Sequence, residues 1–314
     1  MNRILRLFRQ KRAKIVYRSE YMTAIYARDN HRAFDVMKFK KIRDQLVKEH
    51  LITRKDVLVP PRVSDEDLLR VHTKKYLESL KNPLIVAQYL YLDYVNPWDE
   101  FIFEYFRYVT GGTILAAEHA FEQDLVVFNL GGGYHHAHRD KAEGFCLIND
   151  VAVAIEKLRA EKKLRRVLVV DLDYHQGNGV MLIYKNDPDV FTFSIHGATW
   201  EEIDKENNLD IELPSHTGDA EYLEALKSYL PGVVERFQPE LTIYLAGADP
   251  FKEDTLGDFE LTESGLLERD QFVYQQIRQR KIPLAVLAAG GYGPHSWKIY
   301  FNFIKWVITK GNIS

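Results

Sequence analysis

Residues 167–175 read Val-Leu-Val-Val-Asp-Leu-Asp-Tyr-His, an apolar and β-branched run that ends in polar residues. Such a run is typical of a buried strand in a parallel sheet. Because alternate residues of a strand point the same way, Asp171, Asp173 and His175 should converge at its end. A divalent cation would neutralise both carboxylates and bind the imidazole. Taken alone, the pattern also fits a strand followed by a solvated polar turn.

The composition is that of an ordinary globular enzyme, with 314 residues, 46% hydrophobic and 28% charged. The net charge of -3 gives no reason to expect direct binding to nucleic acid. The one cysteine, Cys146, excludes an intrachain disulfide and fits a reducing compartment. No apolar run approaches the ~20 residues that span a bilayer, so we expect a cytoplasmic protein with no transmembrane segment.

The first 14 residues differ from the rest of the chain. Residues 1–14 mix arginine and lysine with isolated apolar residues, and they lack the continuous apolar core of a signal peptide. We interpret them as a basic, solvated N-terminal arm, with weak contact to an anionic surface as the alternative. Residues 15–314 contain no internal repeat or linker and are predicted to form one domain.

Strand-like runs alternate with helical patterns along this domain. The predicted strands are residues 15–17, 124–130, 166–171, 190–196, 241–246 and 282–287. The predicted helices are residues 33–50, 65–80, 112–121, 150–161, 219–236 and 263–279. The alternation predicts a single-domain α/β fold, with a doubly wound, mainly parallel sheet and helices on both faces.

Four of the predicted strands run into polar or glycine-rich segments, where ligands bind in sheets of this kind. These segments are Gly131-Gly-Gly-Tyr-His-His136, Asp171-Leu-Asp-Tyr-His175, Gly247-Ala-Asp249 and Gly290-Gly-Tyr292. We therefore expect one site built from distant parts of the chain. The glycines lack the partners of a phosphate-binding loop.

A catalytic zinc site has three protein ligands and an open position. Asp173 and His175 could supply two ligands, and Asp249 is the best third because the small residues before it let the backbone come close. Alone, Asp249 fits a helix N-cap or a turn equally well. Asp171 is then left to orient a histidine. Such a carboxylate-rich set would also admit Fe(II) or Co(II).

The adjacent pair His135 and His136 follows three glycines and could handle protons near a metal-bound water. Two surface histidines would be the alternative. Tyr292 lies between glycines and could donate a hydrogen bond to a developing oxyanion, although a packing tyrosine is more common. We treat His138 and His196 as bystanders.

Gly144 and Phe145 follow the histidine segment and could line a narrow apolar slot, although Phe145 alone would more often belong to the core. Cys146 is then a small packing residue without a nucleophilic role.

Together these motifs resemble the histone deacetylase family, most closely its class IV branch. The resemblance covers about residues 15–306. The motifs that carry it are Asn129-Leu-Gly-Gly-Gly-Tyr-His-His136, Gly144-Phe-Cys146, Asp171-Leu-Asp-Tyr-His-Gln-Gly-Asn-Gly179, Gly247-Ala-Asp249 and Gly290-Gly-Tyr292.

The resemblance implies an arginase/deacetylase-like fold and zinc-dependent hydrolysis of an amide. It implies that the zinc ligands are Asp173, His175 and Asp249. It assigns acid–base work to His135 and His136, transition-state stabilisation to Tyr292, and one wall of an acyl-lysine tunnel to Gly144 and Phe145. It also implies a monovalent cation, usually potassium, at Asp171, Asp173, His175, Ser194 and Ile195.

The chain departs from the commoner family pattern in several places, one of them residues 31–35, which lack the proline expected after the histidine. Asn178 stands where many relatives have an acidic partner for the second histidine, although class IV relatives share the asparagine. Residues 197–208 do not match the expected tunnel loop, so Trp200 is only a candidate for the opposite wall. We expect these departures to affect the choice of substrate more than the chemistry.

The function expected from the resemblance is hydrolysis of an Nε-acyl-lysine amide in a protein or peptide. Class IV relatives favour long acyl groups, which suggests a lysine fatty deacylase. One alternative is an amidohydrolase for an acetylpolyamine or another small acylated amine, with Asp99 and Glu100 as acidic rim residues. Another alternative is a catalytically silent acyl-lysine binding protein, against which the intact set of ligands, histidines and tyrosine argues.

Overall fold

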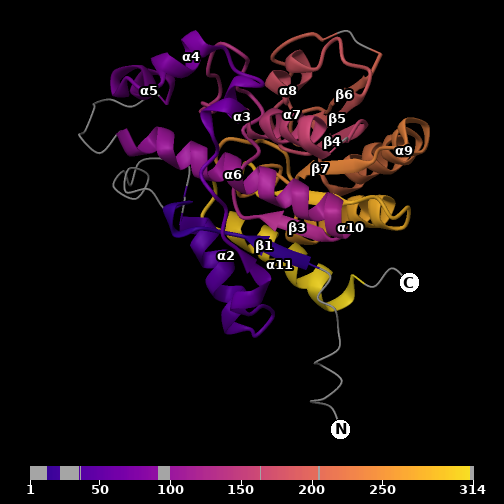
Figure 1. Ribbon diagram of the computed structural model, residues 1–314. Coiled ribbons are helices and arrows are strands. Elements are labelled where there is room, and N and C mark those ends of the chain that lie inside the picture. The colour runs from indigo at the N-terminus through magenta and orange to yellow at the C-terminus, as the bar shows by residue number, and fades with distance from the viewer. Residues whose placement is uncertain are drawn as a thin grey trace.

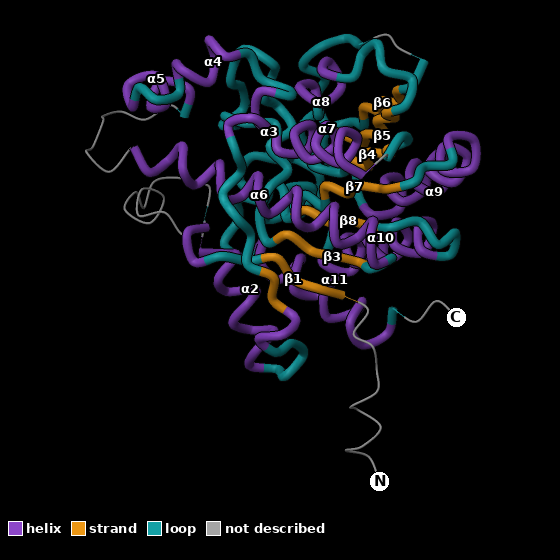
Figure 2. The backbone as a smooth tube through the Cα atoms, viewed as in Figure 1, coloured by secondary structure: helices purple, strands orange, loops and turns teal. Residues whose placement is uncertain are grey.

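The computed structural model describes residues 13–21, 35, 37–90, 100–162, 164–203 and 206–311. At its centre lies an eight-stranded sheet in the order β2-β1-β3-β8-β7-β4-β5-β6, and all its strand pairs are parallel. Figure 2 shows the strands from β1 to β6 stacked in this order. The strands are β1 (Ala13–Val16), β2 (Val57–Leu58), β3 (Val126–Asn129), β4 (Val167–Asp171), β5 (Val190–His196), β6 (Asn208–Glu212), β7 (Leu241–Leu245) and β8 (Leu284–Leu287).

Helices flank the sheet on both sides (Figure 1). One group centres on α6, which packs against β1, β3, β7 and β8 and against α7; the other joins α9 to α10, α10 to α11, and α11 to α2. The helices are α2 (Met37–Lys48), α3 (Asp65–Leu69), α4 (Lys74–Ser79), α5 (Pro83–Tyr89), α6 (Glu100–Gln123), α7 (Asp150–Lys162), α8 (Asn178–Ile183), α9 (Asp219–Phe237), α10 (Glu263–Arg278) and α11 (Ser296–Lys310). The predicted α/β fold is confirmed.

The burial of the strands explains which of them the sequence revealed. Every residue of β3, β4, β7 and β8 is buried, so these strands appear as continuous apolar runs. Strand β6 lies at the edge of the sheet and is only partly buried. Its apolar residues alternate with polar ones, and it was not predicted. Strand β2 was also missed, and it has only two residues.

The structure corrects several predicted boundaries. Strand β1 begins at Ala13, so Ala13 and Lys14 belong to the sheet rather than to the N-terminal arm, of which residues 1–12 lie outside the described part. The predicted helix 65–80 is two helices, because Thr73 leaves the helix to donate its N–H to Arg139 and then caps α4. Helices α5, α8 and α11 were not predicted.

No helix in the described ranges is both long and apolar enough to cross a membrane.

Candidate active site

The carboxyl ends of five adjacent strands lie level with one another. One row of paired residues crosses the sheet from β3 through β8, β7 and β4 to β5, and it consists of Asn129, Leu287, Leu245, Asp171 and Ser194. The segments after the first four of these strands are the four that the sequence predicts to meet. The order of the strands therefore brings residues from four distant parts of the chain to one place.

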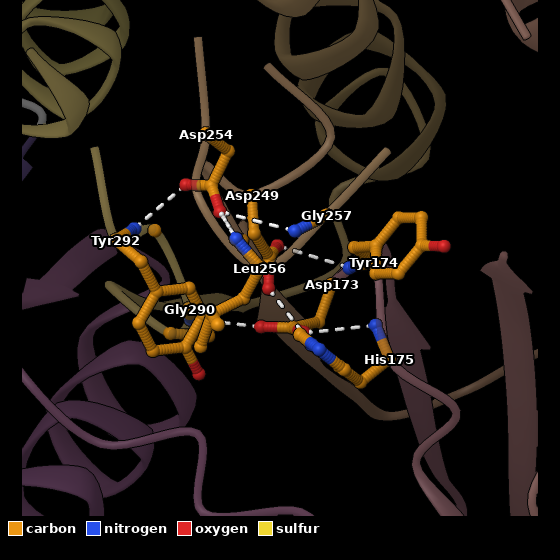
Figure 3. A network of polar contacts seen from close by, with 12 residues as sticks. Asp173, Tyr174, His175, Asp249, Asp254, Leu256, Gly257, Gly290 and Tyr292 are labelled. Atoms are coloured by element: carbon orange, nitrogen blue, oxygen red, sulfur yellow. Dashed lines mark hydrogen bonds and ion pairs between the residues drawn. The ribbon is translucent and has the colours of Figure 1, made fainter. Parts of the chain in front are cut away.

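Asp173, His175 and Asp249 form a group of three potential metal ligands. One ligand atom from each lies within 4.8 Å of the others. The Nδ1 atom of His175 lies 3.1 Å from Oδ1 of Asp173 and 3.1 Å from Oδ2 of Asp249. Both carboxylates are buried, and Figure 3 shows them side by side with the imidazole next to them.

The backbone closes around the two carboxylates. The N–H of Gly290 donates to Oδ2 of Asp173 over 2.8 Å. A Cβ atom at position 290 would lie 2.2 Å from Oδ2 of Asp249 and 2.4 Å from Oδ2 of Asp173, so only glycine fits there. Two carboxylate oxygens and one imidazole nitrogen suit zinc or another divalent ion.

The electrostatics of these three side chains also favour a bound cation. Burial and the carboxylate of Asp173 raise the pKa of Asp249 to about 7. Burial lowers the pKa of His175, but hydrogen bonds to Asp173 and Asp249 outweigh it and raise the pKa to about 10. Both raised pKa values show that the negative charge of the two carboxylates attracts protons to this group. A divalent cation would neutralise the same negative charge, so the group fits such a cation.

The two predicted acid–base histidines lie together beside this group. Nδ1 of His135 is 2.7 Å from Oδ2 of Asp171, and its Nε2 is 3.1 Å from Nε2 of His136. The Nδ1 atom of His136 is 2.8 Å from Oδ1 of Asn178. Each histidine therefore contacts a buried side chain, Asp171 or Asn178, through Nδ1 and the other histidine through Nε2.

Their surroundings shift the two histidines in opposite directions. Burial lowers the pKa of His135, but the charges of Asp171 and Asp173 outweigh it and raise the pKa to about 9. Burial and the charge of His135 lower the pKa of His136 well below its ordinary value. These opposite shifts favour a proton on His135 and disfavour a second proton on His136.

Tyr292 reaches the group from the loop after β8. Its ring centroid lies 6.0 Å from that of His175, with the ring planes at 89°. Asp254 holds the tyrosine backbone by accepting from the N–H of Tyr292 over 2.7 Å (Figure 3). It also accepts from the N–H of Gly293 over 3.2 Å. Burial and the nearby carboxylates raise the pKa of the Tyr292 hydroxyl, so it stays protonated.

A buried lysine supports the same loop from the other side. Nζ of Lys38, in α2, donates to the carbonyl oxygens of Ala289, Gly290 and Gly291 over 3.1, 3.3 and 3.1 Å. The sequence did not point to Lys38 or Asp254, because each acts on backbone atoms that lie far away along the chain.

Gly144, the first of the two predicted slot residues, lies against His136. Gly144 and Phe145 both have left-handed backbone conformations, with φ of 52° and 62°. A Cβ at Gly144 would lie 2.2 Å from Cδ2 of His136, so the chain needs glycine there. Trp200 stacks on His136, with ring centroids 4.1 Å apart and planes at 5°. Phe145 is 45% exposed and Trp200 43%, so both present apolar surface to solvent.

Two of the residues predicted to hold a monovalent cation, Ser194 and Ile195, lie in β5 next to the end of β4. Ser194 pairs with Asp171 across β5 and β4, and Ile195 follows it in the buried strand. Within the described residues, the Ser194 hydroxyl is buried without a hydrogen-bond partner. An unsatisfied buried oxygen beside a carboxylate fits a bound cation.

A polar network that the sequence did not predict extends from Asn178 to the surface. Asn178 donates from Nδ2 to Oε2 of Glu143 over 2.8 Å, and Nε2 of His138 lies 2.7 Å from the same oxygen. His138, Glu143 and Glu201 bring potential ligand atoms within 4.8 Å of one another. His138, treated as a bystander, thus contacts the network. The other such histidine, His196, pairs with Asp210 instead.

The predicted acidic rim is not described. Asp99 lies outside the described residues, and of Glu100 the structure gives only its place at the start of α6. This rim therefore stays a prediction.

Comparison with known proteins places the chain in a family. The family described as "Histone deacetylase domain" matches residues 32–302. The chain belongs to the histone deacetylase family. It is 32% identical to Histone deacetylase 2 of Arabidopsis thaliana over 96% of this chain and 80% of that protein. It is 26% identical to the acetoin utilization protein AcuC of Staphylococcus aureus strain COL, over 90% of this chain and 79% of that protein.

A solved structure shares the fold of this deacetylase family member. It is a histone deacetylase homolog in complex with SAHA, with a TM-score of 0.78 and 28% sequence identity. The match covers 95% of this chain and 84% of the other. Family membership implies a hydrolase that acts on acetyl amides and is generally metal-dependent.

Proposed function

We propose that the protein is a zinc-dependent hydrolase that removes acyl groups from the Nε amine of lysine. The arrangement of three rings supports this proposal. The ring centroids of His136 and Tyr292 each lie 6.0 Å from that of His175. A proton-accepting imidazole and a protonated phenol thus lie next to the same potential metal ligand.

Asp173, His175 and Asp249 would hold the zinc ion. When bound, the ion supplies a Lewis acid for the acyl carbonyl and lowers the pKa of a water molecule. His136, whose pKa is lowered, is suited to take the proton from that water, with His135 beside it. The hydroxyl of Tyr292 donates a hydrogen bond to the acyl oxygen as negative charge develops on it. A protonated histidine then returns a proton to the departing amine.

Potassium is the proposed second cation, at Asp171, Asp173, His175, Ser194 and Ile195. The unsatisfied hydroxyl of Ser194 supports it. A cytoplasmic location and a catalytic domain of residues 15–314 stay predictions.

The proposed substrate is a lysine with a long fatty acyl group. The ring of Trp200 is exposed beside His136, and the ring of Phe145, the residue after Gly144, is also exposed. Leu256 is 44% exposed on the loop that Asp254 ties to Tyr292. Apolar groups at this rim would contact a long acyl chain more extensively than an acetyl group. The resemblance to class IV deacetylases favours the same substrate.

The test is hydrolysis of lysine peptides that carry acetyl, octanoyl or myristoyl groups by zinc-loaded protein, with Tyr292→Phe as the control. Activity that rises with acyl length and is lost in the variant supports the proposal. Activity confined to acetyl groups would overturn the fatty-acyl substrate, and an acetylpolyamine would be assayed next. A zinc-loaded protein that hydrolyses none of these amides would overturn the enzymatic function and favour the acyl-lysine binding protein.

A further inference from the structure

The last carboxylate in the His136 network is Glu143. It precedes Gly144, and its Oε2 accepts hydrogen bonds from Nδ2 of Asn178 over 2.8 Å and from Nε2 of His138 over 2.7 Å. On the other side of the Asn178 amide, Oδ1 lies 2.8 Å from Nδ1 of His136. Asn178 is fully buried and His136 is 5% exposed. The amide of Asn178 is therefore a link between a carboxylate and a candidate catalytic base.

The chemistry of these groups allows one orientation of the amide. A carboxylate only accepts hydrogen bonds, so the NH₂ group of Asn178 must face Glu143 and its oxygen must face His136. That oxygen also only accepts, so Nδ1 of His136 must carry a proton. A neutral imidazole carries only one proton, so Nε2 of His136 then keeps its lone pair.

Glu143 stays ionised in this position. Burial would raise its pKa, but the hydrogen bonds from His138 and Asn178 outweigh burial and lower the pKa below its ordinary value. The side chain is 32% exposed, so it is anchored by these contacts at the edge of the site.

We propose that Glu143 is a positioning residue that fixes the orientation of the Asn178 side-chain amide and thereby keeps Nε2 of His136 unprotonated. This inference rests on the proposed function for its effect on catalysis. An asparagine has two chemically different ends, so it can hold a histidine in either tautomer. Without Glu143, a turned amide would place its NH₂ group against Nδ1 of His136 and move the imidazole proton to Nε2. That tautomer cannot accept a proton from water.

An aspartate at position 178 would not need this support. Its two oxygens are equivalent acceptors, so either orientation would keep a proton on Nδ1 of His136. The structure therefore predicts that Asn178→Asp compensates for the loss of Glu143. In the presence of Glu143, the same change would place two carboxylates about 2.8 Å apart, where they repel each other.

The test is a set of four zinc-loaded variants assayed for kcat and KM on the best acyl-lysine peptide. Glu143→Leu should lower kcat at least about tenfold with KM within about twofold, since general base catalysis contributes roughly 10²-fold or more. Glu143→Gln keeps an acceptor for Asn178 and should stay within about threefold of the wild type. Glu143→Leu with Asn178→Asp should recover most of the lost kcat. Glu201→Leu is the matched control, since it removes the neighbouring carboxylate without removing the acceptor for Asn178.

The second measurement reads the tautomer directly. In ¹⁵N spectra of the imidazole rings, His136 should show a protonated Nδ1 in the wild type and a protonated Nε2 in Glu143→Leu. A kcat for Glu143→Leu within about twofold of the wild type, or a loss that Asn178→Asp does not reverse, would overturn the inference. An unchanged His136 tautomer in Glu143→Leu would also overturn it. If the wild type hydrolyses no acyl amide, the proposed function fails while the spectra still decide the role of Glu143.

Discussion

The ammonium group of Lys38 donates a hydrogen bond to the carbonyl oxygen of Gly291 over 3.1 Å. Gly291 is the residue before Tyr292, so the lysine holds the loop that carries the candidate oxyanion donor. Lys38 is completely buried, and burial lowers its pKa to about 8 although nearby aspartates oppose the shift. A buried cation in this place is costly, and hydrogen bonds to backbone carbonyls offset that cost.

We expect Lys38→Met to lower kcat about tenfold with little change in KM, because a loosened loop misplaces Tyr292. The variant should also lose about 1–3 kcal/mol of unfolding free energy, since the carbonyl of Gly291 loses a buried donor. Urea denaturation and steady-state kinetics measure the two effects. Lys40→Met is the control on the same helix, where the side chain is 40% exposed in a surface pair with Asp44. Equal behaviour of the two variants would contradict the role of Lys38.

Tyr292→Phe should reduce kcat roughly 100-fold, because removal of one oxyanion donor costs about 3 kcal/mol of barrier. Zinc affinity should not change, since the hydroxyl is not a proposed ligand. Kinetics and zinc titration on the same preparation separate the two properties. A variant with the full wild-type kcat would refute the assignment of Tyr292.

Removal of metal should abolish activity and lower thermal stability. The two buried carboxylates of Asp173 and Asp249 lose their neutralising cation, and zinc at a thousandfold excess over its Kd stabilises the folded protein by about 4 kcal/mol. Thermal unfolding at increasing zinc concentrations measures this shift. Asp249→Ala should lose most of the response. The assignment fails if the variant responds to zinc as strongly as the wild type does.

Potassium should raise the thermal midpoint of the wild type relative to tetramethylammonium at equal ionic strength. Ser194→Ala should respond less, because the variant lacks the hydroxyl that is left unsatisfied beside Asp171. In the absence of potassium, the variant should equal or exceed the wild type in stability, since a buried unsatisfied hydroxyl costs about 1–3 kcal/mol. An identical potassium response in both proteins would argue against this site.

Acid should destabilise the protein through His72. This buried imidazole accepts a hydrogen bond from the N–H of Asn149 over 3.1 Å, and burial lowers its pKa to about 4. Because the unfolded chain binds a proton near pH 6.5 and the folded one does not, the stability contribution of His72 is lost as the pH falls from about 6.5 to 4. The loss is about 2 kcal/mol at pH 5. His72→Gln keeps an acceptor but does not titrate, so urea denaturation at pH 7 and pH 5 should show a smaller difference for it. An equal difference would exclude His72 as the cause.

The central part of the fold was accessible from the sequence because four strands are buried on both faces. Strands β3, β4, β7 and β8 are continuous apolar runs, and each leads directly into its polar segment. The convergence of these segments then follows from a general property of parallel sheets. Edge strand β6 could not be recognised in this way, because its residues are only partly buried or exposed and polar residues alternate with apolar ones.

The supporting contacts of the site could not be predicted, because no local pattern announces them. Lys38 acts on a carbonyl 253 positions later in the chain, and Glu143 reaches Asn178 across 35 positions. Asn178 itself stood out in the sequence only because of the family resemblance. The partner that orients the side-chain amide of Asn178 is Glu143, and only the three-dimensional structure identifies it.

The adjacency of β7 and β4 has a consequence for biosynthesis. Asp249 lies 74 positions after His175, so a growing chain has made two of the three candidate ligands long before the third emerges from the ribosome. The loop of Tyr292 is synthesised later still. It is stabilised by a hydrogen bond from the hydroxyl of Tyr300, in α11, to the carbonyl oxygen of Ala289. Since metal binding and folding are coupled, the ion should be captured only when synthesis is nearly complete. A nascent or truncated chain that ends before β7 should therefore remain free of the ion and depend on chaperones.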